Sequence, residues 1–385
     1  MIVEKNKHFD IIICGGGASG LLLANALCKD PTFDHLQIAL IEKEEKNSND
    51  RTWCFWEEGM GQWDAIVSNS WEKALFKAKG FTTAFELAPY TYKMIRGIDF
   101  YKALYPKLKQ KKQLHFFQEE ITSIKPKSQN CTVSTLTSTY TADRVFSSLP
   151  IDHHTKQDRF PVLQQHFVGW SVKTEQPLFD PKTAVFMDFD LPQKGQTRFM
   201  YVLPFSEHEA LVEYTLFSKD LLEKEEYEQA IQEYLIQKKA GNYSITDVEK
   251  GSIPMTAYDF SQHNTAHLMH IGTAGGWTKA STGYTFQKSL QKVDELIAFL
   301  KKDRPLSEFK QKSKFKFYDL LFLDVLSKYN AQGSILFKQM FRHNPPKRIF
   351  AFLEEKTTWW QDLSIMRSFP VGRFVYALIK RLFHL

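Results

Sequence analysis

Residues 10–21, which read DIIICGGGASGL, decide the fold predicted for this chain. The short apolar run at residues 11–14 is typical of a buried parallel strand, and residues 21–27 have the composition of a helix. The small residues between them, 15–20, predict a tight turn from the strand into the helix. A strand, a glycine-rich turn and a helix in this order favour a dinucleotide site over a purely structural turn.

Three glycines of this turn fit the pattern G-x-G-x-x-G. Gly15 permits the tight turn, Gly17 lets a pyrophosphate approach the backbone, and Gly20 lets helix and strand pack closely. The helix that follows offers free N–H groups and a positive dipole end to phosphates. We expect four residues of the turn to contact the cofactor: Gly15, Gly17, Ala18 and Gly20.

A second apolar strand at residues 37–41 ends in Glu42, which lies 22 positions after Gly20. That spacing is close to the ~20 residues expected for a carboxylate that binds a ribose hydroxyl. A carboxylate suits a free ribose hydroxyl and disfavours a 2′-phosphate. Because the site is N-terminal and a long chain follows it, FAD is expected rather than NAD. Arg51 either reaches the same cofactor or is a solvated loop arginine.

Composition places the chain among ordinary globular proteins, and 385 residues are enough for two domains. The four cysteines form no C-x-x-C pair and have no histidine-rich companion. The sequence therefore predicts neither a metal site nor a disulfide framework, and it fits a reducing cytoplasm. Residues 11–28 carry no charge, but their consecutive glycines fit a turn better than a membrane span, so no transmembrane segment is expected.

Charge is distributed unevenly along the chain. Residues 301–385 hold 17 Lys and Arg against 7 Asp and Glu, whereas the preceding 300 residues hold 33 against 37. A basic region beside an acidic body indicates contact with nucleic acid or with a membrane. Large apolar residues interrupt the basic ones and no nucleic-acid motif is present, so a membrane surface is expected and nucleic acid is not. Residues 369–385 predict an amphipathic helix that lies in the membrane interface or packs on the protein.

Strand and turn signals divide the remainder of the chain. Residues 80–87 and 90–95 resemble the two strands of one hairpin. The expected fold class is α/β, with a Rossmann-type FAD-binding domain, an inserted antiparallel β-sheet domain for the substrate, and a helical C-terminal region. The expected boundaries are 1–75, 96–150 and 252–300 for the FAD-binding domain, 76–95 and 151–251 for the substrate domain, and 301–385 for the C-terminal region.

Glu213 stands inside an otherwise apolar strand at residues 210–218. Alternation places Leu211, Glu213 and Thr215 on one face of that strand. A carboxylate buried there must be paired, neutral or functional, and loss of hydration raises its pKa until it can donate a proton near neutral pH. The alternatives are a salt-bridged structural glutamate and an edge-strand glutamate that faces water.

Five segments resemble, in the same order, the lycopene β-cyclase family. They are DRTWCFWE (50–57), MIRGIDFY (94–101), FVGWSV (167–172), RFMYVLPFS with LVEYT (198–215), and IGTAGGWTKASTGYTF (271–286). The resemblance covers about residues 8–300, and the tail that follows is similar only loosely.

The resemblance implies an enzyme that closes the linear ψ-ends of lycopene into β-ionone rings, giving γ-carotene and β-carotene without net redox change. It implies reduced FAD as the active cofactor, NAD(P)H as the reductant, and Glu213 in LVEYT as the general acid and base. Thr52 joins Arg51 among the implied cofactor residues. Because the substrate dissolves in lipid, the expected location is the cytoplasm, at the inner face of the cell membrane. Three aromatic residues are expected to line the substrate, unless they are ordinary core: Trp170, Phe199 and Tyr201.

A second flavin motif differs from that of related flavin hydroxylases. Those enzymes carry Gly-Asp at the end of a late strand and Gly-Gln-Gly ten residues after the acid. Here Thr273 replaces the acid, while Gly283 and Tyr284 keep the spacing, which argues against a hydroxylase-type site. The second set of expected cofactor residues is Gly272, Thr273, Gly283 and Tyr284.

Two other functions remain open at this level. One is a flavin-dependent isoprenoid reductase or hydroxylase, against which Thr273 and Glu213 argue. The other is a non-catalytic carotenoid-binding protein at the membrane surface, in which substitution of Glu213 would leave binding intact.

Overall fold

The strand that precedes the glycine turn lies inside the first sheet of the computed structural model, which describes residues 7–310 and 313–383. Ile11, Ile12 and Ile13 are almost fully buried there, as expected for a strand covered on both faces. The sheet has the order β8-β2-β1-β11-β10-β9, and β17 pairs with β11. Its strands are β1 (Lys7–Cys14), β2 (Ile38–Glu42), β8 (Leu114–Gln118), β9 (Ile121–Pro126), β10 (Cys131–Thr135), β11 (Thr139–Ser147) and β17 (Leu268–His270).

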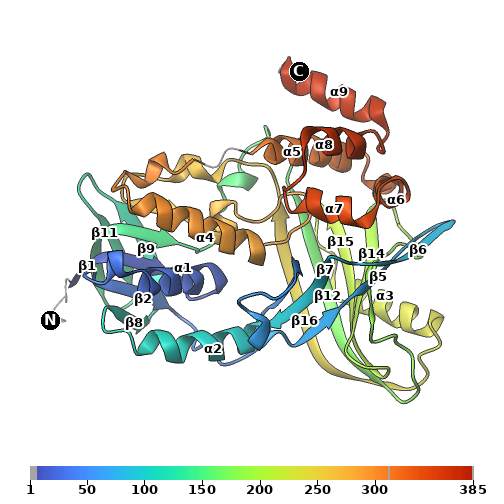
Figure 1. Cartoon of the computed structure of the whole chain (residues 1–385), viewed down its shortest axis with the longest axis horizontal. Coiled ribbons are helices and arrows are strands. Elements are labelled where there is room, and N and C mark those ends of the chain that lie inside the picture. The colour runs from blue at the N-terminus through green and yellow to red at the C-terminus, as the bar shows by residue number, and fades with distance from the viewer. Residues whose placement is uncertain (1–6, 311–312, 384–385) are drawn as a thin grey trace.

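Three helices flank this sheet (Figure 1): α1 (Ala18–Lys29), α2 (Gly97–Lys109) and α4 (Phe286–Leu300). Helix α1 packs beside α4, and the hydroxyls of Ser19 and Ser289 lie 3.1 Å apart. The two ends of the FAD-binding region predicted from the sequence are therefore in contact, although about 270 residues separate them in the chain.

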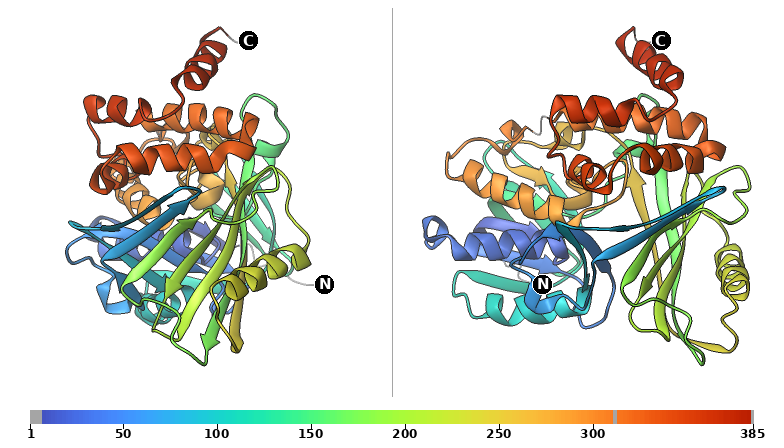
Figure 2. Two further views of the ribbon diagram at one scale, coloured as in Figure 1. Left: turned by 90° about the vertical axis from the view of Figure 1, so that its right-hand side faces the viewer. Right: turned by 45° about the vertical axis from the view of Figure 1, so that its right-hand side comes forward.

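The second sheet has the order β16-β12-β15-β14-β13-β5-β6. All its pairs are antiparallel except β13 with β5, which run parallel. Helix α3 (Lys224–Gln237) covers one face (Figure 2), where Tyr227 and Ile231 pack on Val168 and Tyr214. The strands are β5 (Lys73–Ala78), β6 (Phe81–Glu86), β12 (Leu163–Thr174), β13 (Thr183–Asp188), β14 (Thr197–Pro204), β15 (Glu209–Ser218) and β16 (Tyr243–Met255).

A small third sheet corrects one expectation. It joins β3 (Thr52–Glu58) and β4 (Asn69–Trp71) to β7 (Tyr90–Arg96), so the hairpin predicted from residues 80–87 and 90–95 is wrong. Strand β6 pairs instead with the preceding strand β5. The turn between β5 and β6 contains Gly80, whose φ of +68° suits a tight reversal. The division into FAD-binding and substrate domains stays a proposal.

The C-terminal helices lie over one end of the second sheet (Figures 1 and 2). Phe337 of this region packs against Phe217 and Phe189 of the sheet region. This arrangement completes the predicted fold class, α/β with a helical C-terminal region. The helices are α5 (Lys314–Lys328), α6 (Gly333–His343), α7 (Pro346–Leu353), α8 (Trp359–Met366) and α9 (Val371–Leu382).

The amphipathic segment predicted at residues 369–385 contains α9, and residues 384–385 lie outside the described residues, as do residues 1–6 of the first predicted domain. Within residues 7–310 and 313–383, no helix is long and apolar enough to cross a membrane.

Candidate functional site

A cavity of about 630 Å³ lies between the second sheet, the C-terminal helices and the second glycine-containing region predicted to bind the cofactor, which contributes Thr273 and residues 281–286. We call this region the flavin-type loops. Its sheet wall is built by alternate residues of neighbouring strands, because successive side chains point to opposite faces. Phe199 and Tyr201 come from β14, and Leu211, Glu213 and Thr215 come from β15. The predicted grouping of these last three residues on one face is therefore confirmed.

One row of residues crosses this wall from strand to strand. Tyr201 of β14 pairs with Glu213 of β15, Glu213 pairs with Gly169 of β12, and Gly169 pairs with Glu249 of β16. Paired residues share a face of the sheet, so Glu213 and Glu249 flank Gly169 on the cavity side. A Cβ at Gly169 would lie 3.2 Å from Glu249 Cγ and 3.4 Å from Glu213 Cβ. Glycine thus leaves room for two carboxyl groups.

Glu213 is buried, with 7% of its surface exposed. Burial is the main cause that raises its pKa, to about 8, and the nearby Glu249 carboxylate adds to the rise. The Thr215 hydroxyl opposes the rise by donating a hydrogen bond to Glu213 Oε1. No salt bridge of Glu213 occurs among the described residues, so the structural ion-pair alternative fails. A pKa of about 8 favours the protonated form at neutral pH, and Glu213 lines the cavity.

Glu249 has a different environment. Burial raises the pKa of its carboxyl group, and Asp247 adds to the rise. The Thr52 hydroxyl, which donates a hydrogen bond to Oε2 at 2.8 Å, and the positive charge of Arg51 both lower it. Thr52, expected among the cofactor residues, therefore contacts a carboxyl group on the cavity wall. Arg51 lines the same cavity and donates a hydrogen bond to the Asp50 carbonyl at 2.7 Å.

The N-terminal glycine turn has the geometry of a phosphate cradle. Gly15 adopts a φ of +101°, and a Cβ at Gly20 would lie only 2.0 Å from the Gly15 carbonyl oxygen. Helix α1 begins at Ala18, after Gly17, around which the space for a Cβ is open. Glu42 Oε2 accepts a hydrogen bond of 2.6 Å from the Gly16 backbone N–H. Backbone donors, a helix N-terminus and an acid thus meet at one point, as dinucleotide binding requires.

The second predicted cofactor loop meets this turn. Gly272 has a φ of +62°, and a Cβ there would lie 2.6 Å from Ser19 Oγ at the start of α1. Thr273, Gly283 and Tyr284 line the cavity. Two buried polar atoms beside them, Gln165 Oε1 and Thr282 Oγ1, have no hydrogen-bond partner among the described residues. A buried polar atom without a partner is costly, so these atoms fit the polar edge of a flavin ring.

The predicted aromatic residues separate into two groups. Phe199 and Tyr201 line the cavity, but Trp170 pairs with Val212 and packs in the core beneath α3. Trp170 therefore lies on the opposite face of the sheet, and we no longer propose it as a substrate-lining residue. Sequence reasoning missed Tyr92, whose hydroxyl lies 2.7 Å from that of Tyr201 and 3.1 Å from that of Tyr284.

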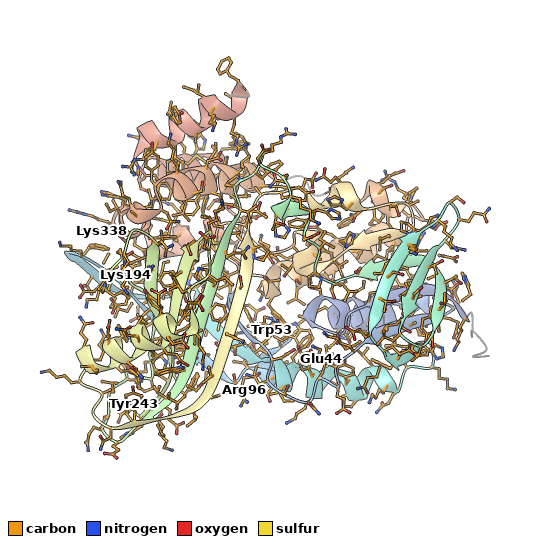
Figure 3. All side chains as sticks on the ribbon, turned by 180° about the vertical axis from the view of Figure 1, so that it is seen from behind. Glu44, Trp53, Arg96, Lys194, Tyr243 and Lys338 are labelled. Carbon is orange, nitrogen blue, oxygen red and sulfur yellow. The ribbon has the colours of Figure 1, made fainter. Side chains whose placement is uncertain are left out.

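The cavity opens between α8 and α9. Leu363, Val371 and Val375 all line it, yet they are 50%, 53% and 44% exposed. Figure 1 shows α9 at the outer edge of the helical region, and Figure 3 shows Trp53, which also lines the cavity, between the two large sheets. The cavity therefore reaches the surface at the C-terminal helices, where exposed Arg367 also lines it, and extends to Thr273 and residues 281–286.

Metal chemistry has no candidate centre in residues 7–310 and 313–383, since no group of three or more His, Cys, Asp or Glu is placed to hold an ion.

Solved structures share the fold at low sequence identity. A geranylgeranyl bacteriochlorophyll reductase-like protein from Thermoplasma acidophilum is 10% identical, with a TM-score of 0.60 over 95% of this chain and 98% of that chain. The flavin-dependent brominase Bmp2 is 13% identical, with a TM-score of 0.59 over 96% and 92%. A variant of halogenase PltM in complex with FAD is 10% identical, with a TM-score of 0.58 over 90% and 82%.

Two sequence comparisons complete the picture. A search of curated proteins found no match. The model of one protein family, described as lycopene cyclase protein, matches residues 10–379, which is nearly the whole chain. The chain therefore belongs to the lycopene cyclase family.

Proposed function

We propose that this protein is a lycopene β-cyclase that uses reduced FAD and converts linear ψ-ends to β-ionone rings without net redox change. The observation that carries the proposal is Glu213, a carboxylic acid held protonated on the wall of a cavity that is otherwise largely apolar. An alkene is a weak base, so its protonation needs an undissociated acid in a site without water. Membership of the lycopene cyclase family supports a carotenoid substrate.

The proton movements balance within one ring closure. Glu213 donates a proton to the terminal double bond, which leaves a tertiary carbocation on the substrate. The next double bond attacks this cation, a carbon–carbon bond forms, and the positive charge moves into the new ring. Loss of a proton from the ring carbon beside the charge gives the β double bond. One proton enters and one leaves, so γ-carotene and then β-carotene have the same mass as lycopene.

Aromatic side chains would stabilise the positive charge along this path. Phe199, Tyr201 and Tyr92 line the cavity near Glu213, and ring faces attract cations that are shielded from water. Burial raises the pKa of Tyr92 and Tyr201 far above the usual value. Both phenols are therefore neutral and do not trap the cation as phenolates.

FAD would be held by Gly15, Gly17, Ala18, Gly20 and Glu42 at the dinucleotide end, and by Gly272, Thr273, Gly283 and Tyr284 at the cavity end. When bound in its reduced form, it would supply an electron-rich ring that stabilises positive charge in the substrate. NAD(P)H is proposed as the reductant that maintains this form.

We propose that the substrate reaches the cavity from a membrane at the opening between α8 and α9. Helices α8 and α9 carry exposed apolar side chains, three of which line the cavity, as amphipathic interfacial helices require. The basic C-terminal region would face anionic lipid at the inner face of the cell membrane. The exposed apolar residues are Trp359, Trp360, Leu363, Val371, Val375, Ile379 and Leu382.

The test is pigment analysis of lycopene-accumulating cells that express the wild-type chain, Glu213→Gln or Glu209→Gln. Glu209 is the matched control because it lies on the same strand outside the cavity, in an exposed ion pair with Lys173. We expect cyclic carotenes of unchanged mass from the wild type and the control, and none from Glu213→Gln.

Three results would contradict the proposal. Products that contain added hydrogen or oxygen would identify an isoprenoid reductase or hydroxylase. Bound but unchanged lycopene would identify a carotenoid-binding protein. Full cyclisation by Glu213→Gln would remove the acid from the mechanism.

A further inference from the structure

We propose that Glu249 is a second acid–base residue of this site, the base that receives the proton released from the ring and returns it to Glu213. This role rests on the proposed cyclase function. It gives the proton released from the ring an acceptor other than Glu213. It begins from the cross-strand row in which Glu213 and Glu249 flank Gly169.

The geometry places both carboxyl groups on the same cavity wall. Strand pairing fixes Glu213 and Glu249 directly opposite Gly169, on its two sides. A Cβ added to Gly169 would lie 3.4 Å from the Cβ of Glu213 and 3.2 Å from the Cγ of Glu249. Both residues line the cavity. A substrate end placed over Gly169 would therefore have one carboxyl group on each side.

The surroundings of Glu213 favour a protonated carboxyl group more strongly than the surroundings of Glu249 do, as an acid and a base require. Among the residues that the structure describes, Glu213 receives a side-chain hydrogen bond from the Thr215 hydroxyl alone and forms no ion pair, so its neutral form is favoured. Glu249 accepts the Thr52 hydroxyl and lies near Arg51, and both interactions favour its charged form. Two carboxyl groups whose surroundings separate their pKa values form a natural acid and base pair.

Other titratable groups that face the pair do not change this assignment. Asp247, on the same strand as Glu249, raises the pKa of Glu249. Cys54 of β3 and Tyr201 of β14 are partly buried, and loss of hydration raises the pKa of each well above neutral. Tyr284, from the flavin-type loop, is neutral for the same reason. Asp50, Arg51 and Lys250 line the same cavity, and Arg51 is the one of these three that lowers the pKa of Glu249.

The proton cycle then closes without an outside reagent. In the proposed cycle Glu213 starts as the carboxylic acid and Glu249 as the carboxylate. Protonation of the alkene leaves Glu213 ionised, and deprotonation of the ring leaves Glu249 protonated. Transfer of that proton from Glu249 to Glu213 restores the starting state, and no electrons are exchanged.

The first test measures the cyclisation kinetics of flavin-loaded Glu249→Gln, with Glu209→Gln as the control. Glutamine keeps the size of the side chain and still accepts the Thr52 hydroxyl. Loss of a general base lowers kcat by roughly 10²–10⁴-fold, and we expect that fall with little change in KM. The rise of the pH–rate profile that reports ionisation of Glu249 should disappear. Unchanged kcat and an unchanged pH profile would overturn the inference while leaving the cyclase function intact.

A second test does not depend on activity. Infrared spectra of the flavin-loaded protein follow the C=O absorption of protonated carboxyl groups as the pH is raised. We expect one band that disappears near pH 8 in the wild type and is absent from Glu213→Gln. In Glu249→Gln the band should persist but titrate at a lower pH, because the neighbouring negative charge is gone.

The two tests separate the possible failures. A titration midpoint that does not move in Glu249→Gln would show that the carboxyl groups do not interact, and would overturn the inference even if cyclisation is confirmed. A shifted midpoint together with a wild type that makes no cyclic product would refute the cyclase function and, with it, the role of Glu249 as its base.

Discussion

Replacing Glu213 by glutamine should stabilise the folded protein while it abolishes catalysis. Burial raises the pKa of Glu213 in the folded state, so folding favours the protonated form. A carboxyl group of this kind lowers stability as the pH rises above its unfolded pKa, and the loss grows until the folded pKa is reached. Glutamine is neutral at every pH and keeps an oxygen that accepts the Thr215 hydroxyl. The stability difference should therefore grow with pH.

The size of this effect follows from the shift itself. The pKa rises from 4.5 to about 8. Each pKa unit corresponds to about 1.4 kcal/mol of free energy. Between pH 4.5 and pH 7 the difference in the free energy of unfolding should therefore reach roughly 3 kcal/mol, an order-of-magnitude value from linkage. Below the unfolded pKa it should vanish, since both proteins are then neutral at this position.

Urea unfolding measures this directly when it is followed by tryptophan fluorescence at several pH values and equal flavin loading. Midpoints are compared, because a chain of 385 residues that contains two large sheets need not unfold in one step. Glu213→Gln should unfold at a higher urea concentration than the wild type at neutral pH and at the same concentration near pH 4.5. Glu209→Gln should show no such trend. A raised pKa of Glu213 would be refuted if Glu213→Gln were less stable than the wild type at neutral pH, since Glu213 would then be ionised and stably paired. It would also be refuted if the difference in unfolding midpoint did not change with pH.

Three further substitutions test other parts of the structure. Gly20→Ala would force a Cβ to 2.0 Å from the Gly15 carbonyl oxygen, so the purified protein should carry severalfold less FAD; normal flavin content would refute the cradle. Lys279→Met removes the ammonium group that lies 2.9 Å from both oxygens of the buried Asp319. Leaving that carboxylate unpaired should lower the free energy of unfolding by about 3–5 kcal/mol. The melting temperature should therefore fall, and a second change, Asp319→Leu, should partly restore it. Trp360→Glu alters a side chain that is 82% exposed, so it should leave flavin content unchanged but reduce co-sedimentation with anionic vesicles; equal binding would argue against α8 as a membrane contact.

The sequence predicted well whatever depends on neighbours along the chain. The glycine turn and Glu42 could be placed because strand, turn, helix and acid follow one another within about 30 residues and each glycine has a steric reason. The face that Glu213 occupies also followed from alternation within a single strand. These are local properties, and the structure reproduces them.

Features that depend on the register between strands far apart in the chain could not be predicted from the sequence. Alternation predicts which residues of one strand share a face, but it does not relate the faces of two strands. Only the pairing of β12 with β15 shows that Trp170 and Glu213 point to opposite sides of the sheet. Glu249 lies in a polar stretch, DVEKGS, which is typical of an exposed strand. It enters the site because β16 pairs with β12, about 80 residues earlier in the chain. A glycine between two glutamates in a cross-strand row is a signal that appears only once the strands are paired.

The same burial that makes Glu213 a usable acid also explains why the opening of the cavity is apolar. Water that reached the wall would solvate the carboxylate and lower its pKa toward the ordinary value, and the acid would be lost at neutral pH. Under the proposed function, a hydrocarbon that entered between α8 and α9 would bring no water with it, and lipid would cover the exposed apolar residues there. The C-terminal helices would then affect the chemistry at a distance. By keeping water from the sheet wall, they would hold the proton on Glu213 until it is transferred to the substrate.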